Sequence, residues 1–63
     1  MSLLGEYQDR YTHPPTDQAK KILFDVLDDI LGRKGFDYGW DECGSEIREE
    51  ILQTNLAIVQ GHL

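Results

Sequence analysis

The sequence predicts an all-α fold, a small helical hairpin in which two amphipathic helices, residues 16–31 and 45–60, follow a short N-terminal arm or helix. Three observations predict it. Apolar residues recur at three- and four-residue steps in both segments, a proline pair precedes the first segment, and a glycine follows each. We therefore divide the chain into an N-terminal arm, residues 1–15, and a helical hairpin domain, residues 16–63.

The N-terminal arm carries four large side chains at helical spacing, interrupted by Gly5: Leu3, Leu4, Tyr7 and Tyr11. A helix this short is marginal alone, and a glycine inside it costs about 1 kcal/mol relative to alanine. Pro14 and Pro15 disfavour helical backbone in the residues before them, which ends the segment. The arm is either a frayed end or a docking element that packs across the hairpin or across a second subunit.

The first main helix is predicted to begin after Thr16, as its N-cap, and to end at Gly32 in the left-handed conformation. At about 100° per residue, its apolar positions make one continuous stripe. The members of this stripe are Ala19, Ile22, Leu23, Val26, Leu27 and Ile30. We expect the stripe to form one half of the hairpin core.

The second main helix is predicted to begin with Ser45 as its N-cap and to end at Gly61. Its expected buried face consists of Ile47, Ile51, Leu52, Ile58 and Val59. Residues 32–44 lie between the helices and alternate aromatic with polar side chains over a short span broken by glycine. So short an alternation is weak support for a strand, and an ordered loop is expected.

The small size of the chain favours a partner. A chain of 63 residues buries only about 60% of the surface that its unfolded form exposes. Cys43 is the only cysteine, so no intrachain disulfide can form, and a lone thiol suits a reducing compartment. Two helices leave one side of each stripe open, which favours dimerisation into a helical bundle.

Charge limits the kinds of partner. Six Lys and Arg against twelve Asp and Glu give a formal net charge of −6. This argues against contact with a nucleic-acid backbone, which requires cations, and favours a basic partner. No apolar run is long enough to span a bilayer, and the first residues turn polar too soon for a signal peptide. We expect a soluble, cytoplasmic protein whose partner is itself or another protein.

A polar seam, defined as Arg48, Asn55 and His62, interrupts the apolar face of the second helix at seven-residue intervals. In heptad terms the three share one position, with Ile51 and Ile58 at the other core position. A single buried asparagine at such a site can fix register and oligomeric state, which predicts a homodimer. The alternative is that Asn55 bonds a loop carbonyl within a monomer and that Arg48 and His62 lie at exposed helix ends.

The aromatic segment between the helices is the second candidate for contact. Phe36, Tyr38 and Trp40 cannot all reach one core from an alternating backbone, so at least one should be partly exposed. Tyr38 and Trp40, beside Arg33, are residue types enriched at binding hot spots, and they make a candidate contact patch. In the alternative interpretation, Phe36 and Trp40 cover the open end of the hairpin.

A repeated acidic spacing occurs on both helices, as Asp25-x-x-Asp28-Asp29 and Glu46-x-x-Glu49-Glu50. This spacing resembles the carboxylate motifs of MazG-type pyrophosphohydrolases, an all-helical family that uses EExxE on one helix and ExxD on another. The resemblance covers only these two triads, and the first lacks the double-acid start. It implies magnesium binding and nucleotide hydrolysis. A solvated acidic face is the alternative, because both triads point away from the apolar stripes.

No other residues predict chemistry. His13, Cys43 and His62 are scattered and match no zinc spacing, and the glycines form no phosphate loop. We therefore expect no catalytic residue, metal or cofactor. The sequence favours a small, acidic, non-enzymatic interaction module, homodimeric, over a phage-type inhibitor that mimics DNA toward a basic enzyme, and over the magnesium-dependent hydrolase.

Overall fold

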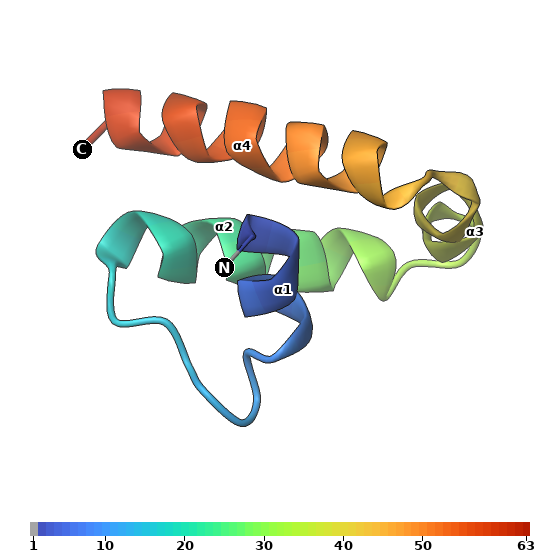
Figure 1. Ribbon diagram of the computed structural model, residues 1–63, viewed down its shortest axis with the longest axis horizontal. Helices are drawn as coiled ribbons and strands as arrows, with labels where there is room; N and C mark the ends of the chain where they lie inside the picture. Colours follow the sequence, from blue (N-terminus) through green and yellow to red (C-terminus); the bar gives the residue numbers. More distant parts are fainter. Residues whose placement is uncertain (1) are drawn as a thin grey trace.

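The computed structural model describes residues 2–63, which form four helices and no strand, with 71% of these described residues helical. These helices are α1 (Leu3–Gln8), α2 (Gln18–Leu31), α3 (Phe36–Glu42) and α4 (Ser45–Gly61). Figure 1 shows α2 and α4 side by side and running in opposite directions, with α1 lying across the pair and α3 at the turn between them. The predicted all-α hairpin is confirmed, and its N-terminal arm contains a helix. The predicted N-cap of α4 was wrong, because Gly44 is the N-cap and Ser45 is the first residue of the helix.

The start and end of α2 differ from the prediction. Asp17, not Thr16, is the N-cap, and its carboxylate accepts a hydrogen bond from the backbone N–H of Lys20 at 3.0 Å. A charged acceptor suits the positive end of a helix better than a hydroxyl. Gly32 remains in right-handed helical conformation at φ −78°, and the left-handed residue is Gly35 at φ 95°. The turn out of α2 is therefore made three residues later than expected.

The predicted ordered loop was wrong over residues 36–42, which form α3. Gly35 in the left-handed region redirects the chain and allows a new helix to begin at once. In helical backbone Phe36 and Trp40 share one face, four residues apart, while Tyr38 lies on another. Tertiary contacts of Trp40 therefore outweigh the local signals, a short alternation broken by glycine, from which a loop was expected.

The core gathers side chains from α1, α2 and α4, with Trp40 of α3 packed against it. Its buried members are Leu3, Leu4, Tyr7, Ala19, Leu23, Phe24, Leu27, Leu52 and Leu56. The arm thus docks across the hairpin of its own chain. Several residues expected in the core are instead exposed, namely Ile22, Val26, Ile30, Ile47 and Ile58. Phe24 and Leu56, absent from the predicted faces, take part in the core in their place.

Carboxylates from both main helices hold α1 in place. The two oxygens of Glu49 accept hydrogen bonds from the backbone N–H groups of Leu3 at 3.1 Å and Leu4 at 2.7 Å. Asp28 accepts one from the Tyr7 hydroxyl at 2.8 Å and forms an ion pair with Arg10 at 2.7 Å. A short helix that is marginal alone is therefore fixed at its first turn and near its last.

Candidate functional site

Helix α1 covers only one side of the α2–α4 hairpin. Asp28 on α2 and Glu49 on α4 point to α1, whereas Val26 and Ile51, each two residues away, project from nearly the opposite side of their helices at about 100° per residue. Apolar side chains gather on this second side, which we call the open face. Its members are Ile22, Val26 and Ile30 of α2, Phe36 of α3, and Ile47, Ile51 and Ile58 of α4.

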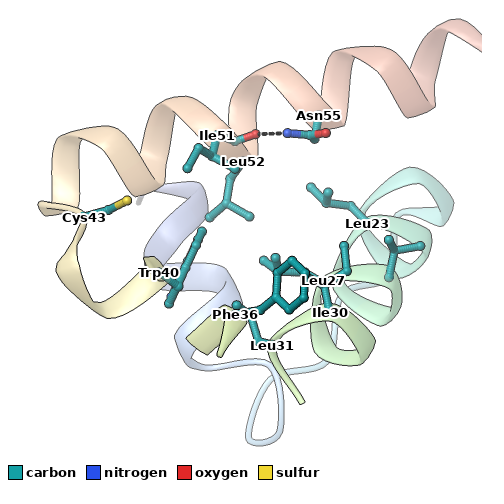
Figure 2. A pocket seen from close by; sticks show the side chains of 11 residues that line it. Leu23, Leu27, Ile30, Leu31, Phe36, Trp40, Cys43, Ile51, Leu52 and Asn55 are labelled. Carbon is teal, nitrogen blue, oxygen red and sulfur yellow. Dashed lines mark hydrogen bonds between the residues drawn. The ribbon is translucent and has the colours of Figure 1, made fainter. Parts of the chain in front are cut away.

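The open face is hollowed between α2, α3 and α4. The hollow has a volume of about 280 Å³, and none of its lining residues belongs to α1. Core leucines form its floor, while Val26, Ile30 and Phe36 stand at its rim and are 51%, 38% and 60% exposed. Figure 2 shows the labelled side chains of all three helices directed toward the same space. The arrangement is a concave apolar surface open to solvent.

Charge is absent from the lining of this hollow. None of the described Asp, Glu, Lys or Arg residues lines it, and its polar side chains are Asn55 and Cys43. The Cys43 thiol donates a hydrogen bond to the Gly39 carbonyl at 3.2 Å, and the Asn55 amide donates one to the Ile51 carbonyl at 2.7 Å. The hollow therefore provides contact area for an apolar group. It does not provide a set of acidic and basic side chains.

The three members of the polar seam have separate local roles. Arg48 donates hydrogen bonds to the carbonyls of Trp40 at 2.8 Å and Asp41 at 2.7 Å, which satisfies backbone acceptors at the end of α3. Asn55 bonds the Ile51 carbonyl of its own helix, so the expectation of a loop carbonyl as its acceptor was wrong. His62 is the exposed C-cap of α4. Only Asn55 of the three lines the hollow.

The predicted contact patch is not assembled. Arg33 forms an ion pair with Asp29 at 3.1 Å at the end of α2, and Tyr38 is 70% exposed on the outer side of α3. The Trp40 ring packs edge-on against Tyr7, with centroids 6.1 Å apart. The expectation that at least one aromatic residue is exposed is confirmed. Trp40 covers the end of the core, but Phe36 does not, because its side chain stands at the rim of the hollow.

The two acidic triads do not converge. Asp28 and Glu49 hold α1, Asp29 pairs with Arg33, and the remaining carboxylates of the triads are exposed. Within residues 2–63, no group of three or more His, Cys, Asp or Glu side chains is placed to hold a metal ion. The two triad carboxylates that make contacts between helices, Asp28 and Glu49, thus serve the docking of α1.

Two pKa shifts reflect this use of the carboxylates. The hydrogen bond from the Leu4 amide, followed by those from Gln53 and the Leu3 amide, lowers the pKa of Glu49 below its ordinary value. Burial, and then the Asp28 carboxylate that accepts its hydrogen bond, raise the pKa of the Tyr7 hydroxyl. Both shifts favour the protonation states that keep α1 docked at neutral pH.

Sequence reasoning expected one side of each apolar stripe to stay open, but it did not identify the exposed residues, because it treated each stripe as a single buried face. A signal was present. The two stripes are wider than one helix–helix contact requires, and Phe24 extends the first stripe to a second flank. A third element that covers only one flank leaves the other exposed.

No family model, curated protein or solved structure matches this chain. Among the described helices, none combines the length and apolar character needed to cross a membrane. Function is therefore inferred from the geometry of the open face.

Proposed function

We propose that this chain is a non-enzymatic protein-interaction module that binds its partner through the open face. The observation that carries the proposal is a concave apolar surface without a carboxylate, on a chain with twelve Asp and Glu residues. Monomers expose single apolar side chains routinely, but a contiguous patch rimmed by polar residues is typical of an interaction site. The predicted aromatic patch is less suited to this role, because its residues lie apart.

Energetics also favours the open face. Burial of apolar surface contributes about 25 cal/mol per Å², so several half-exposed Ile, Val and Phe side chains supply a contact of useful strength. The exposed ion pair between Arg33 and Asp29 would add at most about 1 kcal/mol. The acidic outer surface keeps the chain dispersed and discourages contacts elsewhere. Binding would thus be directed to the one side from which charge is absent.

A charge placed on the open face tests this function. Val26→Glu adds one negative charge at a 51% exposed position, and Gln18→Glu adds the same charge on the outer side of the same helix. Tagged wild type and both variants are used to capture proteins from the native host, with quantification by mass spectrometry. Partners retained by wild type and Gln18→Glu should fall about tenfold or more with Val26→Glu, since burial of an unpaired charge is costly. Equal recovery by all three contradicts the proposal.

Two further measurements separate the other functional hypotheses. An apolar contact should survive washing in about 0.5 M salt, whereas a DNA-mimicking inhibitor bound through carboxylates should be released. Isothermal calorimetry with magnesium alone tests the hydrolase hypothesis, for which a saturable heat is required. Circular dichroism of each variant shows whether its helices are intact.

A further inference from the structure

We infer that the partner of the open face is a second copy of this chain, bound with its α4 antiparallel to the first, about a two-fold axis that passes between Thr54 and Asn55. The inference rests on the proposed function and names its partner. It begins from the order of residues along the exposed side of α4, which is closed by neither α1 nor α2.

The exposed side of α4 is self-complementary. The residues that point to this side are Ile47, Ile51, Thr54, Asn55, Ile58 and His62. Their spacings, four, three, one, three and four residues, are the same in both directions along the chain. When two such helices lie antiparallel, Ile51 meets the partner's Ile58, and Asn55 meets the partner's Thr54. Every member of the set then faces another member, as an isologous interface requires.

The polar pair at the centre suits this arrangement. Asn55 uses one amide hydrogen to bond the Ile51 carbonyl, and its carboxamide oxygen accepts no hydrogen bond from the residues that the structure describes. A threonine hydroxyl can donate to that oxygen. Two Thr54–Asn55 pairs, related by the axis, would satisfy the polar groups in the middle of an otherwise apolar contact. They would also fix its register, because a shift by one turn leaves them unpaired.

Charge favours the antiparallel orientation over the parallel one. The carboxylates of α4 all lie in its first half, at Glu46, Glu49 and Glu50, and residues 51–63 contain no Asp, Glu, Lys or Arg. An antiparallel pair places the acidic half of each helix beside the uncharged half of the other. A parallel pair would bring the six carboxylates of two copies to one end. Opposed helix dipoles add to the preference.

The size of the open face approaches that of the smallest specific dimer interfaces. Helices of 14 and 17 residues rise about 1.5 Å per residue, so they are about 20 to 25 Å long. With two such helices packed about 10 Å apart, the face covers on the order of 500 Å² before the relief of its side chains is counted. The smallest specific interfaces bury about 600 Å² per partner. A second copy, unlike a short peptide, would cover the face of both helices at once.

Disulfide trapping tests both the partner and the orientation. In a Cys43→Ala background, two single variants are made, Ile51→Cys and Ile58→Cys, and are oxidised separately and as a mixture with copper phenanthroline. The antiparallel pair brings Ile51 of one copy to Ile58 of the other, so the mixture should form mixed dimers at least tenfold faster than either variant forms its own. Within each separate variant, the two thiols would lie about 10 Å apart, too far for a disulfide.

The outcomes distinguish the inference from the proposed function. Faster linkage within each separate variant would overturn the antiparallel arrangement. A monomeric mass of the wild-type chain by sedimentation, together with slow linkage in all three samples, would overturn the second copy as partner. If Val26→Glu still abolishes capture of some other protein, the proposed function stands without this inference. Circular dichroism confirms that both cysteine variants are folded.

Discussion

On the side covered by α1, the hairpin brings apolar and charged groups together, whereas the hollow of the open face is lined by apolar groups without a charged side chain. Under α1, Asp28 and Glu49 accept hydrogen bonds from groups of the same chain, and Leu52 is fully buried. On the open face, Val26 and Ile58 are about half exposed with no covering element. The closed side is complete in one chain, and the open face has the composition of a core that lacks its second half.

This difference assigns separate roles to two flanks of each main helix, the closed flank under α1 and the open flank on the open face. The closed flank determines whether the chain folds, because the core and all the contacts of α1 lie there. The open flank contributes less to the fold of one chain and more to association. Substitutions on the closed flank should therefore change the stability of the single chain, and substitutions on the open flank should change its dependence on concentration.

The largest effect is expected from the closed side. Leu52→Ala removes a side chain with 0% exposure and should lower the free energy of unfolding by about 2–5 kcal/mol. A core in a chain of this size supplies only about 3–5 kcal/mol, so the variant should be largely unfolded at room temperature. Urea titration followed by circular dichroism measures this, with Gln60→Ala on the outer side of α4 as the control. A cooperative transition near that of wild type would show that the core lies elsewhere.

A smaller effect is expected from acid. The pKa of Glu49 is lowered in the folded chain, so its carboxylate contributes stability that is fully present above its ordinary pKa of about 4.3. This contribution is lost as the pH falls through the lower pKa of the folded state. The docking of α1 should therefore loosen in that range, which changes the fluorescence of Trp40 beside Tyr7.

Glu49→Gln separates this carboxylate from the others. The variant should show weaker docking of α1 at neutral pH and a flatter dependence of Trp40 fluorescence on pH. Hydrogen exchange at the Leu4 amide, whose partner is Glu49, should be faster than in wild type. Glu50→Gln, which changes an exposed carboxylate of the same helix, is the matched control and should behave as wild type. An unchanged acid response in Glu49→Gln would mean that other carboxylates govern the docking.

The sequence predicted the hairpin well because apolar periodicity reports directly on helices of 14 and 17 residues. It did not predict α3, since a seven-residue helix depends on distant contacts, here Trp40 with Tyr7 and Arg48 with the end of the helix. It also did not predict the roles of Asp28 and Glu49. Their place on the polar side of each helix is readable from the sequence, but the arrival of α1 there is not.

The candidate site was predicted only in part, and for a related reason. Asn55 stood out because it interrupts an apolar stripe, and it does line the hollow. Arg48 stood out by the same rule, yet it satisfies carbonyls of α3. Spacing along one helix shows which residues share a side but not which neighbour lies there. Ile47 and Ile58 were therefore placed in a core that the chain by itself does not provide.

The smallest effect on a single chain, and the sharpest contrast between the two flanks, is expected from Ile58→Gln. At high dilution its free energy of unfolding should lie within about 0.5 kcal/mol of wild type, because Ile58 is already 56% exposed. As concentration rises, the melting temperature of the wild type should rise, since association stabilises the folded state by mass action. That of Ile58→Gln should stay constant. Ala57→Gln, on the outer side of α4, should follow the wild type.

Added salt should strengthen the concentration dependence of the wild-type melting temperature, because two copies with a charge of −6 each repel across an uncharged contact. A wild-type melting temperature that is independent of concentration would show that the two flanks differ in composition without differing in task.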